Sequence, residues 1–297
     1  MLLFSDSPLR YDQCHEVLLI QDSSEFTIGR GPVLYNSVEN EKAKSADEDQ
    51  TMKTIKKVLA VIVVLLAAAV CGLGIYFGNG SAADQNARNS IEHPAAGVTV
   101  DATKNGQIIF MPEDGTQTGI VFYPGAGVHY DAYAELAERF AEDGYMCALV
   151  HMPLNLAVLN ENAADAVIAE YPDITRWYLC GHSMGGSAAV NYSWKHQDQL
   201  NGLILLASRI KRDFSQSDLP VLLVSATEDG ICTPERLKSG IRQEPAVFTH
   251  IVIEGGCHGY FGSYGNQLND GIPTISREAQ MDQTAEGVRI FIEGNND

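Results

Sequence analysis

Apolar residues are distributed along the chain in two different ways. From Val58 to Phe77 they form one uninterrupted run without a charged side chain. As a helix this run crosses the ~30 Å hydrocarbon core of a bilayer, so it predicts a transmembrane helix over residues 58–77. Beyond residue 97, short apolar runs alternate with amphipathic stretches, which is typical of a parallel sheet whose strands are joined by helices.

The second region predicts an α/β domain over residues 97–297, with a mostly parallel sheet and helices on both of its faces. The run from Gly119 to Tyr123 is apolar throughout, as expected for a central strand that is buried on both sides. No segment between strands is long enough to form a large lid, so we expect a compact domain with an open site. The strands are expected at 97–102, 107–111, 119–123, 145–151, 177–180, 203–207, 221–225 and 247–253, and the helices at 130–143, 156–170, 187–195 and 277–292.

The charges that flank the long apolar run predict its orientation. Lys53, Lys56 and Lys57 lie just before it, and no Lys or Arg follows until Arg88. Because positive residues favour the cytoplasmic side, we expect the N-terminus in the cytoplasm and the α/β domain outside the cell membrane. A cleaved signal peptide is the alternative, since residues 81–83 are small, but the run is longer than the apolar core of a signal peptide. An uncleaved anchor is therefore favoured.

The polar segments on either side of the run show no sustained period. Residues 1–51 mix acidic and polar residues with short apolar patches, which predicts a disordered cytoplasmic segment. Met52 begins a segment that looks like the natural start of an anchor. The alternative interpretation is therefore that the protein starts at Met52 and that residues 1–51 are upstream sequence. Residues 78–96 are rich in Gly, Ser, Ala and Asn, which predicts a flexible linker between anchor and domain.

Charge and cysteine spacing exclude two classes of function. The formal net charge of the chain is -18, and such a field repels a phosphate backbone, so we expect no nucleic-acid partner. The six cysteines form no CxxC pair and no Cys/His spacing suited to zinc. We therefore expect neither a metal site nor a cofactor.

The candidate chemistry centres on Ser183, in the segment Gly-His-Ser-Met-Gly of residues 181–185. This motif follows a short apolar strand and precedes a helix, a context in which it forms a sharp, strained turn that exposes the serine. Gly181 and Gly185 leave room for the close backbone approach that such a turn requires. Ser183 is thus the candidate nucleophile.

A serine hydroxyl needs a base to take its proton and an acid to orient that base, in the chain order serine, acid, histidine. Asp229 directly follows the strand expected at 221–225, and Glu228 is its rival. Asp229 is favoured because its short side chain, followed by Gly230, fits a tight turn. His258 follows the last strand among glycines and is the candidate base. The other histidines of the domain precede Ser183 in the chain, adjoin it, or lie within expected helices and strands: His129, His151, His182, His196 and His250.

Two backbone N–H groups are expected to stabilise an oxyanion. One belongs to Met184, which directly follows the nucleophile at the start of a helix. The other belongs to the loop after the strand at 119–123, where Ala126 is favoured by position and Gly125 is the fallback.

Four segments carry a resemblance to a known family. They are residues 122–128 (Phe-Tyr-Pro-Gly-Ala-Gly-Val), 152–158, 181–186 and 258–271. On these the chain resembles the alpha/beta-hydrolase family, and more narrowly its small lidless bacterial members, which are related to dienelactone hydrolases. The resemblance implies an alpha/beta-hydrolase fold and a triad of Ser183, Asp229 and His258. Dienelactone hydrolases use Cys in place of this serine, so the resemblance does not carry over their reaction.

The hypothesis that follows is a membrane-anchored serine hydrolase that cleaves a small-molecule ester or related acyl bond. Transfer of the acyl group to another acceptor would use the same residues. A binding module without catalysis is a third option, because a fold does not imply a function, but a complete triad argues against it.

Cys232 and Cys257 lie near Asp229 and His258 on two loops that this fold brings together. Outside the cytoplasm these cysteines are able to form a disulfide, although two independent thiols are favoured.

Overall fold

The structure is a computed structural model, and it describes residues 32–103, 106–238 and 244–295. Contacts divide the chain into two compact units, Met1–Ala67 and Ala68–Asp297.

One helix, α1 (Pro32–Asn79), contains the predicted span, and it is long and apolar enough to cross a membrane. It differs from the prediction at residues 32–51, which continue the helix instead of forming disordered chain. Extending an existing helix costs much less than starting one. Pairs at i and i+4 spacing, such as Lys53 with Asp49 at 2.6 Å, also favour its polar part. Residues 1–31 lie outside the described residues.

The second unit is built on an eight-stranded sheet in the order β1-β2-β4-β3-β5-β6-β7-β8. β1 pairs with β2 and β2 with β4 in antiparallel fashion, and all other neighbours are parallel, which confirms the mostly parallel sheet. The strands are β1 (Val98–Asp101), β2 (Gln107–Pro112), β3 (Thr118–Tyr123), β4 (Met146–Val150), β5 (Arg176–His182), β6 (Gly202–Leu206), β7 (Val221–Ala226) and β8 (Phe248–Ile253).

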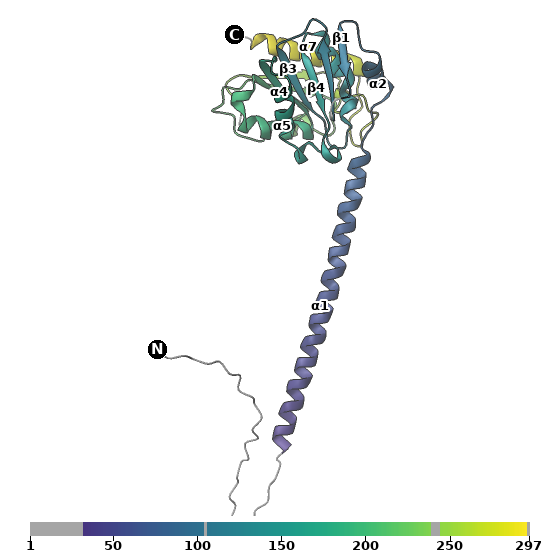
Figure 1. The fold of residues 1–297 in the computed structure, drawn as a ribbon, viewed down its shortest axis with the longest axis vertical. Coiled ribbons are helices and arrows are strands. Elements are labelled where there is room, and N and C mark those ends of the chain that lie inside the picture. The colour runs from purple at the N-terminus through teal and green to yellow at the C-terminus, as the bar shows by residue number, and fades with distance from the viewer. Residues whose placement is uncertain (1–31, 104–105, 239–243, 296–297) are drawn as a thin grey trace, which may run out of the picture. The chain divides into compact units, whose positions relative to one another are not determined.

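Helices cover both faces of this sheet, as predicted (Figure 1). Side chains of β3 alternate between two cores. Ile120 and Phe122 pack with α2 (Gln85–Glu92), α3 (Ala134–Glu142) and α7 (Arg277–Gly294), whereas Val121 and Tyr123 pack with α4 (Ala163–Glu170) and α5 (Met184–Lys195). Both cores are buried, so β3 is apolar from Gly119 to Tyr123, as expected of a central strand. The helices are α2 (Gln85–Glu92), α3 (Ala134–Glu142), α4 (Ala163–Glu170), α5 (Met184–Lys195), α6 (Pro234–Lys238) and α7 (Arg277–Gly294), with short 3-10 turns η1 (Tyr130–Tyr133), η2 (Pro153–Asn155), η3 (Ala157–Leu159), η4 (Gln197–Gln199) and η6 (Gly259–Phe261).

Residues 78–96, predicted as a flexible linker, are instead part of the domain. Ser81 forms a β-bridge with the loop that follows β3. Asp84 caps α2, and its carboxylate also pairs with Arg277 at the start of α7. Ala87 is fully buried in the core. The small and polar residues of this segment therefore serve for packing and capping, and the domain begins well before residue 97.

The parallel strands β3, β5, β7 and β8 all end at the same edge of the sheet, and ligands of open α/β sheets bind outside this edge. The loops that follow these strands carry all of the predicted site residues. The fold thus gathers the candidate site at one end of the domain.

Candidate active site

Ser183 occupies a sharp turn between the end of β5 and the start of α5. Its φ of 54° and ψ of -117° are rare for a residue with a side chain and cost of the order of 1–3 kcal/mol. The turn is held from β6 and the loop after it: the Ser183 N–H donates to the Leu206 carbonyl at 2.9 Å, and the Ser208 hydroxyl donates to the Ser183 carbonyl at 2.8 Å. Strain that is held so firmly is typical of functional sites.

Two glycines of the motif allow this turn, as the sequence predicts. A Cβ atom at Gly185 would lie 2.1 Å from the Tyr123 carbonyl oxygen, and one at Gly181 would lie 2.6 Å from the Gly185 backbone. Any side chain at these positions would push α5 away from β3 and β5. The glycines therefore place the N-terminus of α5 directly beside the end of β3.

The structure brings Asp229 and His258 together. Asp229 follows β7 and His258 follows β8, and both side chains are completely buried, with Nδ1 of His258 2.8 Å from Oδ2 of Asp229. The second carboxylate oxygen accepts N–H bonds from Ile231 at 2.8 Å and Cys232 at 2.6 Å, which fixes the direction of the carboxylate. The rival Glu228 is exposed and accepts a bond from the Thr227 hydroxyl instead.

The second ring nitrogen of His258 is left without a partner. Nε2 is buried and makes no hydrogen bond among the described residues, and none joins it to Ser183. An unpaired buried nitrogen costs about 1–3 kcal/mol, and buried polar groups left without a partner are rare enough to require an explanation. Hydrogen bonds of this kind are often incomplete until a substrate is bound.

The hydrogen bonds of the loop after β3 distinguish between the two oxyanion candidates in it, Ala126 and Gly125. The N–H of Gly125 donates to the Tyr133 hydroxyl at 3.0 Å, and that of Gly127 donates to the Asn155 carbonyl at 2.9 Å. The N–H of Ala126 has no hydrogen-bond partner within the described part of the chain. Met184 is the first residue of α5, where an N–H group has no partner inside its own helix. Ala126 and Met184 therefore hold the donors that remain available, whereas Gly125 does not.

His182 has a place in the site that sequence reasoning missed. Its buried ring lies 4.6 Å from the His258 ring, centroid to centroid, and its Nδ1 is 2.8 Å from the Tyr133 hydroxyl. Burial lowers the pKa of His182 well below its usual value, and the neighbouring His258 lowers it further. The backbone of His258 opposes this lowering of the pKa in part, although Nε2 of His182 makes no hydrogen bond among the described residues.

With its pKa lowered in this way, His182 is neutral, and its Nδ1 can accept a hydrogen bond. Tyr133 accepts the N–H of Gly125, so its hydroxyl proton is free to be donated to Nδ1 of His182. This chain of hydrogen bonds ties the start of the loop after β3 to the residue before Ser183. The sequence indicates this contact only by an aromatic residue at position 133, which would be equally expected of an ordinary core residue.

Asp270 is a second missed residue, and it connects the loops of Asp229 and His258. Its Oδ1 accepts the N–H groups of His258 at 3.0 Å and Gly230 at 3.3 Å, and its Oδ2 accepts that of Gly259 at 2.7 Å. Oδ1 also accepts the N–H of Gly271 at 2.8 Å. One carboxylate thus holds both partners of the buried pair through their backbones.

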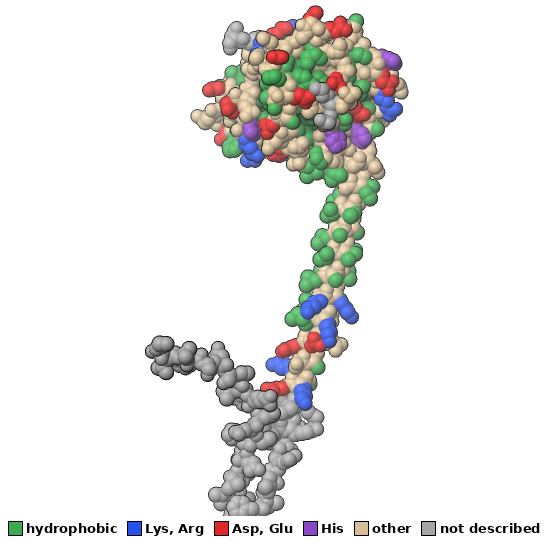
Figure 2. Space-filling model, viewed as in Figure 1, with side chains coloured by type: hydrophobic (Ala, Val, Ile, Leu, Met, Phe, Trp, Pro, Cys, Tyr) green, Lys and Arg blue, Asp and Glu red, His purple; other side chains and the backbone are tan. Residues whose placement is uncertain are grey.

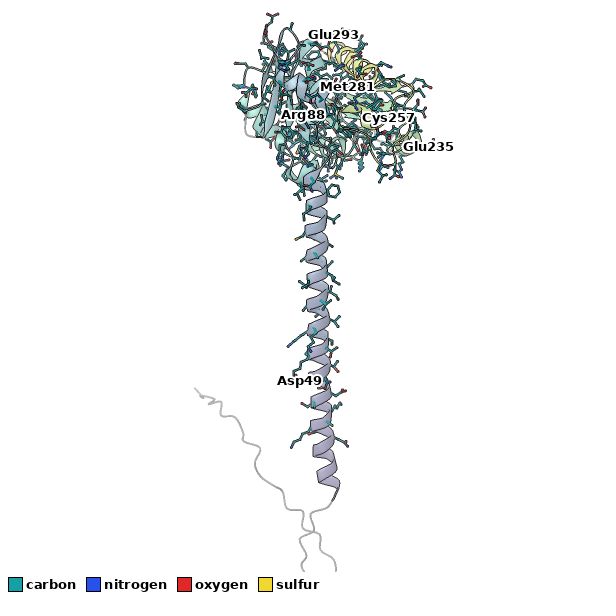
Figure 3. All side chains as sticks on the ribbon, turned by 90° about the vertical axis from the view of Figure 1, so that its right-hand side faces the viewer. Asp49, Arg88, Glu235, Cys257, Met281 and Glu293 are labelled. Atoms are coloured by element: carbon teal, nitrogen blue, oxygen red, sulfur yellow. The ribbon has the colours of Figure 1, made fainter. Side chains whose placement is uncertain are left out.

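Gln280 of α7 fixes the same loop from the other side. Its side-chain carbonyl accepts the Cys257 N–H at 2.9 Å, and its side-chain amide donates to the Cys257 carbonyl at 2.8 Å. The Gln280 side chain is fully buried. One side chain thus pairs with both backbone polar groups of Cys257, the residue before His258, as a neighbouring strand would. In Figure 3, Cys257 of the loop after β8 and Glu235 of α6, the helix that follows β7 in the chain, lie on the same side of the domain.

Cys232 and Cys257 are both free thiols in the structure. Burial, followed by the nearby Asp229, raises the pKa of Cys232 to about 11. Burial and Asp270 raise the pKa of Cys257 to about 12. Thiols with such pKa values are poor nucleophiles at neutral pH, so neither competes with the serine for that role. Among the described residues, no group of three or more His, Cys, Asp or Glu side chains is placed to hold a metal.

Comparison with protein families gives a match that covers the site. The model of a family described as the alpha/beta hydrolase family matches residues 119–282, a range that includes every site residue named above. A search of curated proteins finds no match. The narrower resemblance to dienelactone hydrolases stays a prediction.

Proposed function

Because the chain belongs to the alpha/beta hydrolase family, we propose that it is a serine hydrolase that cleaves an ester or a related acyl bond. One observation carries the proposal: a buried Asp229–His258 pair, 2.8 Å apart, leaves Nε2 unpartnered at the edge of the sheet where the strained turn presents Ser183. Order along the chain, strand ends and burial all agree with the roles of nucleophile, base and acid.

The proposed reaction has two stages. Ser183 Oγ attacks the acyl carbon while His258 Nε2 takes the hydroxyl proton, and Asp229 stabilises the imidazolium that forms. The intermediate collapses, the bond to the leaving alcohol breaks, and His258 returns the proton to that alcohol. Water then attacks the acyl-enzyme by the same route and releases the acid. A serine and an activating base suffice for this chemistry.

The negative charge of both intermediates would fall on the former carbonyl oxygen. The free N–H groups of Ala126 and Met184 are the donors proposed to receive it. One such donor is worth about 100- to 1000-fold in rate. Because Gly125 is occupied by Tyr133, the loop after β3 offers Ala126 for this role.

The proposed location is a membrane, with α1 as a single-pass anchor. Lys53, Lys56 and Lys57 precede the apolar run and support a cytoplasmic N-terminus and an extracytoplasmic domain.

A fluorophosphonate probe tests the proposal because it reacts only with an activated serine. We expect the full-length wild type to be labelled and the Ser183→Ala variant not to be labelled. Ser187→Ala is the matched control, since Ser187 lies one turn further along α5, and it should be labelled like the wild type. A wild type that is not labelled and turns over no ester would rule out the proposed function.

A further inference from the structure

The last residues of α1 are joined to the candidate active site. They belong to the same compact unit as the domain, which starts at Ala68. The Asn155 side-chain amide donates to the carbonyl of Phe77 at 2.9 Å and to that of Gly78 at 3.3 Å. The Phe77 ring lies against Gly127, where an added Cβ would be 3.4 Å from it. The end of the predicted span thus contacts the loop that carries Ala126.

The chain that follows α1 strengthens this connection. The Ser81 N–H donates to the Gly127 carbonyl at 2.6 Å, and the Ser81 carbonyl accepts the His129 N–H at 3.0 Å. The carbonyl of Asn155 accepts the Gly127 N–H at 2.9 Å. The residues after the span and the proposed oxyanion loop are therefore linked by backbone hydrogen bonds on two sides. No free linker separates the site from the anchor.

Exposed apolar side chains surround this junction. Leu154 is 47% exposed, Val158 44% and Leu159 54%, and all three flank Asn155 in the turns η2 and η3. Leu154 has a φ of 53°, which is unfavourable for a leucine, and its side chain lies beside Gly78. Hydrophobic side chains gather on the side of the domain that adjoins the last turns of α1 (Figure 2).

A second loop at the same edge of the sheet is also apolar and exposed. Leu268 is 82% exposed and Ile272 85%, and both lie within two residues of Asp270, which holds the loop of His258. Large apolar side chains this exposed cost free energy if left in water, and when they gather on one face they indicate a binding surface. Exposed apolar side chains therefore occur both beside the loop of Ala126 and beside the loop of His258.

We propose that this edge of the domain rests on the bilayer that holds α1, and that the substrate is a long-chain acyl ester dissolved in that bilayer. The inference rests on the proposed function and deepens it by naming the substrate class. Phe77 ends the apolar run, so it lies where hydrocarbon gives way to head groups, and side chains bonded to its carbonyl lie at the same depth. Leu154, Val158 and Leu159 then contact lipid, and an acyl chain reaches Ser183 without crossing water.

The test uses the full chain reconstituted in phosphatidylcholine vesicles and two esters with one leaving group. Methylumbelliferyl acetate is soluble, and methylumbelliferyl oleate resides in the bilayer. We expect the double variant Val158→Asp, Leu159→Asp to lose about tenfold in oleate hydrolysis and to keep acetate hydrolysis within about twofold. Val158 is 44% exposed and Leu159 54%, so the bilayer would bury about half of each, and the sum is about the tenfold worth of one whole aliphatic side chain. Ile290→Asp is the control, since Ile290 is also exposed but lies near the far end of α7, and it should change neither rate.

The outcomes separate this inference from the proposed function. A wild type that cleaves the acetate but not the oleate overturns the inference alone, and so does a double variant that loses both rates equally or neither. A wild type that cleaves neither ester overturns the proposed function. A second measurement does not depend on activity: the wild type has two tryptophans, and Leu159→Trp adds one whose fluorescence brominated lipids should quench. Ile290→Trp should not be quenched, and an unquenched Leu159→Trp would overturn the inference.

Discussion

Asp270 offers a sharp prediction because one carboxylate holds the loops of both Asp229 and His258. In Asp270→Asn a neutral amide keeps one acceptor oxygen and presents an NH₂ group at the other position. Either the Gly259 N–H, at 2.7 Å, or the N–H groups of His258 and Gly230, at 3.0 and 3.3 Å, then face a donor. A hydrogen bond to a charged group is worth about 1.5–3 kcal/mol, so we expect the unfolding free energy to fall by about 2 kcal/mol.

The effect on activity should be larger than the effect on stability. Loss of the clamp lets the backbone of His258 shift, and a displacement near 1 Å costs about 100-fold in rate. We expect kcat for a soluble ester to fall by about this factor while KM stays within about twofold, because Asp270 is proposed to act on the base and not on substrate binding. The assay is steady-state ester hydrolysis, combined with urea unfolding followed by circular dichroism.

Asp282→Asn is the matched control for this change. Asp282 is an exposed carboxylate of α7 that pairs with Arg139 at 2.8 Å. Exposed pairs contribute about 0–1 kcal/mol, so this variant should keep both its stability and its kcat. If Asp270→Asn keeps a wild-type kcat, or if its KM rises while kcat is unchanged, Asp270 does not position His258.

Three further predictions concern the neighbours of the proposed triad. Tyr133→Phe removes the acceptor of the Gly125 N–H and the donor to His182, so the unfolding free energy in urea should fall by about 2–4 kcal/mol, and an unchanged value would show that this bond does not form. Asp229→Asn should lower kcat by about 10⁴-fold and Glu228→Gln by less than about twofold, whereas the opposite order would identify Glu228 as the acid. Because burial lowers the pKa of His182 in the folded protein, the unfolded chain binds more protons than the folded one below the ordinary histidine pKa of about 6.5. The unfolding free energy should therefore be complete above that pH and fall below it by up to about 1.4 kcal/mol per pH unit. Urea unfolding between about pH 7 and pH 5.5 measures this slope, and His182→Gln should flatten it.

Much of the fold was predictable because its signals are local. The apolar run of β3, the Gly-x-Ser-x-Gly turn and the strand ends before Asp229 and His258 can each be recognised within a few residues. Residues 78–96 were mistaken for a linker because small and polar residues also suit capping and close packing. Asp84 at the N-cap of α2 was the available signal, since a capping aspartate before a short helical stretch distinguishes a helix from free chain.

The support of the site was harder to predict than its principal residues. Asp270 accepts a bond from Gly230, 40 positions away in the chain, and Tyr133 and His182 are 49 positions apart. No spacing rule relates such residues, because tertiary packing alone brings them together. Position along the loop favoured Ala126 over Gly125, but the bond that occupies the Gly125 N–H involves Tyr133 and is revealed only by the folded chain.

The central claim is that Ser183 becomes covalently acylated, and the most direct measurement is mass spectrometry of its peptide. The full-length protein would be incubated with an activated carbamate ester, which leaves a slowly hydrolysed carbamoyl group on an active serine, and then digested. We predict that the modification lies on Ser183 in the wild type and is lost in His258→Ala. Modification of another residue, such as Cys257, or an unmodified Ser183 in a protein that still turns over esters, would contradict the account.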